Sequence, residues 1–120
     1  MPERNLLLID DEDMVSLTFR EYLLREGCAV DSARDLQTAR QCLADGSYAA
    51  VWLDLQLTGF STADCLRFLS EARDAAPDAT LIAVSSYASV QVQYDASTAG
   101  ADRFVQKPFD ARRVAATLLG

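Results

Sequence analysis

An apolar run followed by a helical pattern recurs five times along this 120-residue chain. The runs predict strands at about Asn5–Ile9, Cys28–Asp31, Ala49–Asp54, Thr80–Ser85 and Arg103–Gln106. Strands that alternate with helices in this way form a parallel sheet with helices on both faces. The sequence therefore predicts an α/β fold with a doubly wound, five-stranded parallel sheet and five helices.

Residues that cap or end helices stand between these runs. Gly27 occupies the position of a C-terminal cap after the first helix. The third helix is expected at about Ser61–Ala75, where Pro77 stops it, and the fourth at about Ser89–Ala99. Asp110 is the expected N-cap of the fifth helix. These signals support the same alternating order of elements.

Chemically distinctive residues stand where four of the five runs end. They are Asp10 and Asp11 after the first run, Asp54 at the end of the third, Ser85 at the end of the fourth and Lys107 after the fifth. Right-handed crossovers bring the carboxyl ends of parallel strands to one edge, where such sheets bind ligands. Clustered carboxylates raise one another's pKa and resist burial unless a hard cation joins them. We therefore predict a cation site beside a hydroxyl and an ammonium, a set suited to handling phosphate.

The composition argues against other classes of function. A net charge of −7 disfavours direct binding to nucleic acid, whose phosphates it would repel. No apolar stretch approaches membrane-spanning length, and the absence of His removes the usual general base. Three cysteines without CxxC spacing predict reduced thiols in a cytoplasmic protein. The length predicts a single domain over residues 1–120.

Four short segments at the predicted strand ends carry a resemblance to a known family. The segments are IDDED, LDLQL, VSS and KPF, after strands one, three, four and five. In this order and spacing, from Asn5 to about Leu119, the chain resembles the receiver domain of bacterial two-component response regulators. The resemblance implies a flavodoxin-like sheet with strand order 2-1-3-4-5.

The resemblance also implies a function. A phosphohistidine kinase would transfer a phosphoryl group to Asp54 in a reaction that depends on Mg²⁺. Asp11 and Asp54 would bind the ion directly, together with the backbone carbonyl of Gln56, and Asp10 would act largely through water. A carboxylate nucleophile needs no general base, which suits a chain without His.

Further roles follow from the resemblance. Lys107 would pair with phosphoryl oxygens, and its peptide bond to Pro108 would be cis. Ser85 would hydrogen-bond another phosphoryl oxygen and draw in the loop before helix four. Phe104 matches the family's switch aromatic. The surface of helix four, strand five and helix five would then change for partner binding.

Two residues are expected to influence the lifetime of the phosphorylated state. Gln56 and Tyr87 stand two positions beyond Asp54 and Ser85, at places that flank the path of hydrolytic water in resembling domains. An amide can orient water but cannot act as a base. A tyrosine ring over the acyl phosphate would exclude water. We therefore expect a persistent phosphoryl group.

The resemblance implies partners rather than a substrate. A sensor histidine kinase or a phosphotransfer protein would supply the phosphoryl group, and a second copy of the domain could form a homodimer. The domain would catalyse only its own phosphorylation and dephosphorylation, in the cytoplasm, without contact to membrane or nucleic acid.

Two positions depart from the family pattern. The family usually has Pro four residues after the phosphorylated Asp and Gly four further on, where this chain has Thr58 and Thr62. Gly59 stands between them and can supply a positive φ. An unusual path of this loop is therefore expected.

Three alternatives remain open at this point. A haloacid-dehalogenase-type phosphatase fits poorly, because Gln56 stands where its DxDxT signature needs a second acid. A pseudo-receiver that is never phosphorylated would usually lack the acidic pair, the Asp or the Lys, all of which this chain keeps. A transcription factor would need a DNA-binding domain, for which 120 residues leave no room. Output is therefore expected from a partner or from a longer regulator or hybrid kinase.

Overall fold

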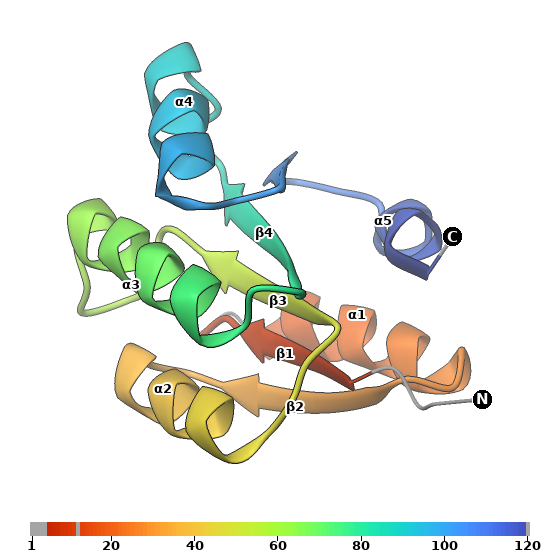
Figure 1. Cartoon of the computed structure of the whole chain (residues 1–120). Coiled ribbons are helices and arrows are strands. Elements are labelled where there is room, and N and C mark those ends of the chain that lie inside the picture. Colours follow the sequence, from red (N-terminus) through yellow and green to blue (C-terminus); the bar gives the residue numbers. More distant parts are fainter. Residues whose placement is uncertain (1–4, 12, 120) are drawn as a thin grey trace.

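The computed structural model describes residues 5–11 and 13–119, with backbone only for residues 13–16 and 119. Five strands and five helices alternate along these residues (Figure 1). The strands are β1 (Asn5–Ile9), β2 (Ala29–Ala33), β3 (Ala50–Asp54), β4 (Thr80–Ser85) and β5 (Arg103–Gln106). The helices are α1 (Asp13–Arg25), α2 (Leu36–Asp45), α3 (Thr62–Ala75), α4 (Val90–Ala99) and α5 (Ala111–Leu119). The predicted alternation is confirmed.

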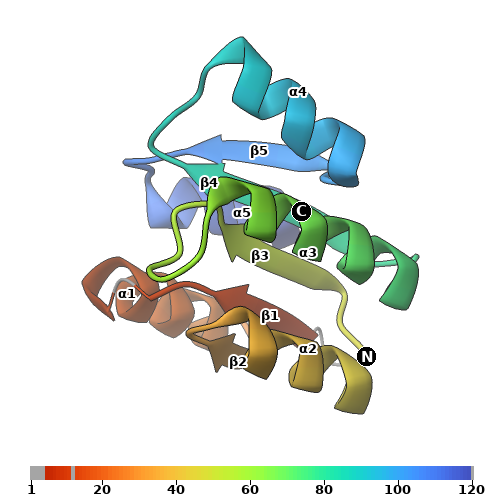
Figure 2. The same ribbon diagram turned by 90° about the vertical axis from the view of Figure 1, so that its left-hand side faces the viewer.

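All four strand pairings are parallel, and the order is β2-β1-β3-β4-β5 (Figure 2). This is the predicted doubly wound sheet with flavodoxin-like order. Because every strand runs in the same direction, the carboxyl ends of all five meet at one edge. That edge positions the site described below.

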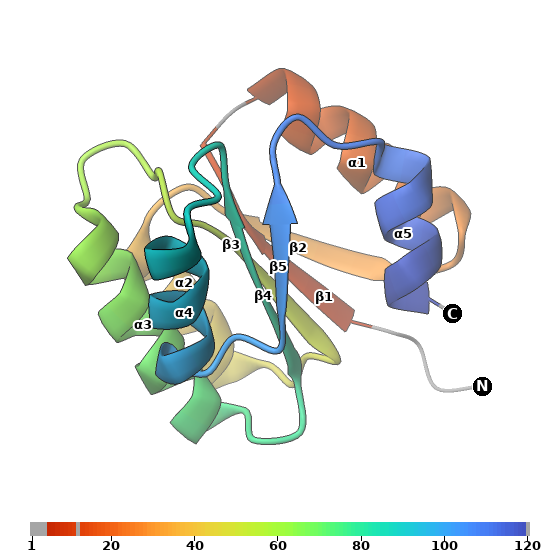
Figure 3. The same ribbon diagram turned by 90° about the horizontal axis from the view of Figure 1, so that it is seen from above.

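The sheet separates two apolar cores. Helices α2, α3 and α4 cover one face, and α1 and α5 cover the other (Figure 3). Successive side chains of a strand point to opposite faces. Accordingly Leu7 and Ile9 pack with α2, α3 and α4, whereas Leu6 and Leu8 pack with α1 and α5. Every residue of β3 is buried, as expected for a central strand covered on both sides.

Helices α3 and α4 each begin one residue after their predicted starts, Ser61 and Ser89, and end where predicted. Ser61 caps α3 in a reciprocal capping box with Asp64, and Ser89 caps α4 by accepting a hydrogen bond from the Val92 amide. Asp110 Oδ1 accepts hydrogen bonds from the backbone of the first turn of α5. Ser61 and Ser89 are therefore the N-caps of α3 and α4 rather than their first helical residues.

Strand β2 is displaced toward the C-terminus of its predicted range, Cys28–Asp31. It ends at Ala33, because its backbone continues to pair with β1 as far as Ile9. The side chains of Asp31 and Ser32 are exposed on this edge strand, so placing polar residues there costs little free energy. Their polarity therefore hides from the sequence that the strand continues past Asp31. Within the described residues, no disulfide joins Cys28, Cys42 and Cys65. No helix in the described ranges has the length and apolar character needed to cross a bilayer.

Candidate functional site

Three aspartates meet at the carboxyl edge of the sheet. Asp10 and Asp11 follow β1 and Asp54 ends β3, and carboxylate oxygens of all three lie within 4.8 Å of one another. Asp54 is fully buried and Asp10 nearly so. Like charges at this spacing repel strongly away from water. The donor set consists of hard carboxylate oxygens, which are ligands that fit Mg²⁺. A bound Mg²⁺ ion would reduce the repulsion among the carboxylates.

A lysine from the far side of the site pairs with the central carboxylate. Lys107, which follows β5, donates from Nζ to Asp54 Oδ2 at 2.6 Å. The Lys107 side chain is 8% exposed and that of Asp54 is not exposed. Burial makes such a pair sensitive to the loss of either partner, because the charge left behind is not solvated. The Lys107–Pro108 peptide bond is cis.

Ser85 lies buried at the end of β4, next to the strand that carries Asp54. Its Oγ accepts a hydrogen bond from the Tyr87 amide at 3.0 Å, and its carbonyl accepts one from the Lys107 amide at 3.0 Å. The fold thus places at this edge all five residues that the sequence predicted there, namely Asp10, Asp11, Asp54, Ser85 and Lys107.

The loop after β3 holds Asp11 through a backbone donor. The Thr58 amide donates to Asp11 Oδ2 at 2.7 Å, and Gly59 follows with a φ of 88°. Burial raises the pKa of the Asp11 carboxyl, but hydrogen bonding from Thr58 outweighs it, so the pKa lies below its ordinary value. A proline at position 58 would have no N–H to donate. Thr58 is thus a contact of the site that motif spacing did not reveal.

Gln56 contacts both sides of the site. Its backbone amide donates to Asp54 Oδ1 at 2.8 Å, and its side-chain Oε1 accepts from the Ser86 amide at 2.7 Å. The second bond joins the loop after β3 to the loop after β4. From its sequence position we expected Gln56 to flank the path of hydrolytic water. The sequence did not indicate its hydrogen bond with the Ser86 amide.

Phe104, the predicted switch aromatic, and Tyr87, the ring expected to exclude water, differ in exposure. Phe104 is half-buried and packs against the core formed with α2, α3 and α4. It also lines a small pocket of about 210 Å³ between α4 and β5. Tyr87 is 70% exposed, so its ring is largely solvated in this structure. Its influence on the phosphorylated state stays a prediction, as does that of Gln56.

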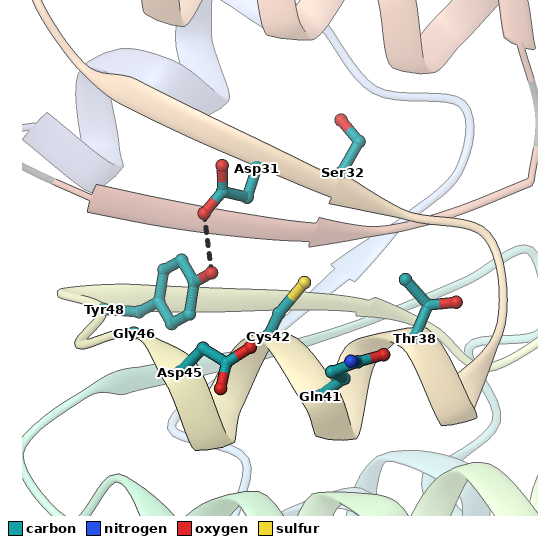
Figure 4. A pocket seen from close by; sticks show the side chains of 8 residues that line it. All are labelled: Asp31, Ser32, Thr38, Gln41, Cys42, Asp45, Gly46 and Tyr48. Carbon is teal, nitrogen blue, oxygen red and sulfur yellow. Dashed lines mark hydrogen bonds between the residues drawn. The ribbon is translucent and has the colours of Figure 1, made fainter.

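A larger pocket, of about 440 Å³, lies elsewhere, between β2 and α2 (Figure 4). Its lining includes Asp31, Cys42 and Tyr48, and the Tyr48 hydroxyl donates to Asp31 Oδ2 at 2.6 Å. None of the predicted site residues lines it. It is therefore separate from the acidic cluster.

Comparison with known proteins gives a consistent result. The profile of the response regulator receiver domain matches residues 6–119. The transcriptional regulatory protein ResD of Bacillus subtilis is 30% identical over 112 residues, which cover 93% of this chain and 45% of ResD. The nitrogen assimilation regulatory protein NtrX of Azorhizobium caulinodans is 29% identical over 110 residues, which cover 92% of this chain and 24% of NtrX. The chain thus spans less than half the length of these two curated relatives.

Solved structures share the fold. A response regulator of Burkholderia pseudomallei, with a phosphorylated aspartic acid, a calcium ion and citrate, has a TM-score of 0.87 and 28% identity. The match covers 97% of this chain and 66% of that one. The beryllofluoride-activated receiver domain dimer of NtrC4 has a TM-score of 0.85 and 25% identity, covering 96% of this chain and 93% of that one.

Proposed function

The chain belongs to the family of response regulator receiver domains, and on that premise we propose that Asp54 accepts a phosphoryl group. The observation that carries the proposal is the position of its buried carboxylate, among two further carboxylates and 2.6 Å from Lys107 Nζ. Family membership excludes the dehalogenase-type phosphatase considered above.

The proposed reaction is transfer from a phosphohistidine. An Asp54 oxygen forms a bond to phosphorus while the phosphorus–nitrogen bond of the donor breaks, and the imidazole nitrogen keeps the electron pair. The nucleophile is already an anion, so no residue has to remove a proton. This agrees with the lack of His in the chain.

Asp10, Asp11 and Asp54 are the residues that would hold Mg²⁺, with the Gln56 carbonyl as a further oxygen ligand. When bound, the ion would offset the negative charge that the phosphoryl oxygens share with the carboxylates. Asp11 would contribute in an orientation held by the Thr58 amide, whose bond occupies one of its two oxygens.

Lys107 and Ser85 would bind the transferred group. The Lys107 ammonium lies beside one Asp54 oxygen, and a phosphoryl group there would bring it new anionic acceptors. The Ser85 hydroxyl proton is available for donation even while Oγ accepts from Tyr87. A new bond from Ser85 would draw the loop between β4 and α4 toward Asp54.

The surface of α4, β5 and α5 would carry the signal. Tyr87, Val90 and Tyr94 expose large apolar side chains at and just before α4, a surface that suits a protein partner. Phe104 packs beneath α4 and would couple a shift of the loop to this surface. The proposed dimer with a second copy would use the same region.

A sensor histidine kinase or a phosphotransfer protein is the proposed donor, and the cytoplasm, where such donors are phosphorylated, is the proposed compartment. The domain would catalyse only its own phosphorylation and dephosphorylation. Because the curated relatives extend well beyond the matched region, output through a further domain or a separate partner is part of the proposal.

The test is incubation with phosphoramidate and Mg²⁺, followed by intact mass measurement. We expect one added phosphoryl group on the wild type and on Asp78→Asn, an exposed control, and none on Asp54→Asn. Failure of the wild type to gain mass would favour the pseudo-receiver. Gain by Asp54→Asn would refute the assignment of the residue.

A further inference from the structure

The loop between β4 and α4, residues 86–89, is attached to the opposite side of the site by one side chain. The Ser86 amide donates to Gln56 Oε1 at 2.7 Å, across 30 residues of sequence. Within the described residues, the other hydrogen bonds of this loop are local. They join Tyr87 to Ser85, Ala88 to Gln93, and Ser89 to Val92 and Gln93.

The bond has a defined polarity. An amide N–H can only donate, so the Gln56 atom that faces Ser86 must be the oxygen. The backbone N–H of the same residue donates to Asp54 Oδ1 at 2.8 Å. Two consecutive bonds therefore connect the carboxylate of Asp54 to the backbone of Ser86, and both pass through Gln56.

We propose that the Gln56 side chain is a positioning residue that holds the loop of residues 86–89 in its resting arrangement and releases it when Asp54 is phosphorylated. The reason is that phosphoryl oxygens on Asp54 would compete with Gln56 Oε1 for the hydrogen bond from the Ser86 N–H. An anionic phosphoryl oxygen accepts a hydrogen bond about twice as strongly as a neutral amide oxygen. A phosphoryl group on Asp54 would also change the acceptor of the Gln56 backbone N–H. The inference rests on the proposed function for its trigger, but not for the resting contact.

Two substitutions separate the acceptor from the bulk of the side chain. Gln56→Met keeps the length and removes the acceptor, whereas Gln56→Glu keeps an acceptor oxygen at nearly the same position. We expect amide exchange at Ser86 in the resting protein to be about twofold to tenfold faster in Gln56→Met, and close to wild type in Gln56→Glu. Equal exchange in all three proteins, or loss of protection in both variants, would overturn the proposal.

The release is tested with beryllofluoride and Mg²⁺ as the probe. Because Gln56→Met has no loop contact to break, we expect its apparent affinity for the probe to rise about twofold to tenfold over wild type. An unchanged or lower affinity would overturn the coupling between the contact and the site. If the wild type does not bind the probe at all, the proposed function fails, while the exchange comparison still decides whether Gln56 holds the loop.

Discussion

Lys107 Nζ lies 2.6 Å from Asp54 Oδ2, although 53 residues separate the two in sequence. Both side chains are buried, and two more carboxylates stand beside them. The Lys107 ammonium opposes the repulsion among the three carboxylates. The stability of the fold and the proposed phosphoryl transfer should therefore depend on the same pair of residues.

Replacing the lysine should destabilise the fold strongly. We expect Lys107→Met to lower the free energy of unfolding by about 3–5 kcal/mol in EDTA, because a buried carboxylate loses its partner. Arg40→Met, which breaks the exposed pair of Arg40 and Glu71, serves as control and should cost about 1 kcal/mol or less. Urea unfolding at neutral pH measures both. Similar losses in the two variants would show that the buried pair has no special importance.

Magnesium should stabilise the folded protein through the acidic cluster. An ion that binds only the native state at 100 times its Kd adds about 2.7 kcal/mol to the free energy of unfolding. We expect thermal melting to shift upward with Mg²⁺ in the wild type and in Asp78→Asn. The shift should be absent in Asp11→Asn, which lacks one of the proposed ligands. A full shift in Asp11→Asn would place the ion elsewhere.

The role of the hydrogen bond from the Thr58 amide to Asp11 can be tested by substituting proline, the residue that resembling domains usually have at this position. Thr58→Pro removes the donor, whereas Thr58→Ala keeps it. We expect Thr58→Pro to weaken Mg²⁺ binding by about 10-fold or more, the range seen when a metal ligand loses its supporting hydrogen bond. Thr58→Ala should match wild type in the same calorimetric titration. Equal affinity in the two variants would mean that the bond does not orient Asp11.

Thiol reactivity should differ sharply between Cys42 and Cys65. Burial raises the pKa of the Cys65 thiol to about 11, and the charge of Asp54 adds to this effect. A raised pKa leaves almost no thiolate at pH 8, and the side chain has no exposed surface. Iodoacetamide should therefore modify the half-exposed Cys42 first and Cys65 only after unfolding, as read by peptide mass mapping. Early labelling of Cys65 in the native protein would contradict this burial.

Activation should act on one end of α4 more than on the other. The C-terminal end is held by α3, because Ser70 donates to the Ala99 carbonyl and Arg73 to the Gly100 carbonyl. The N-terminal end adjoins the loop that Ser85 would draw inward. We expect beryllofluoride with Mg²⁺ to change amide exchange most over residues 85–94 and least near Ala99. Unchanged exchange over residues 85–94, with binding confirmed, would argue against the switch.

Much of this architecture was predictable because it depends on period and order. Strands β4 and β5 have their predicted bounds, since apolar residues between turn residues mark strands. The convergence of Asp54 and Lys107 followed from parallel topology alone. The contacts of Thr58 and Gln56 were not predictable in the same way. They depend on the path of a loop, and a backbone N–H is present at nearly every residue, so residue type carries no signal of its partner.

Chemical trapping tests most directly whether Asp54 accepts the phosphoryl group. Borohydride reduces an acyl phosphate on Asp to homoserine, so the modified residue can be located by peptide mass mapping. After incubation with phosphoramidate, we predict homoserine at position 54 with Mg²⁺ and none when EDTA replaces the ion. Homoserine at another aspartate, or at position 54 to the same extent in EDTA, would contradict the proposed site.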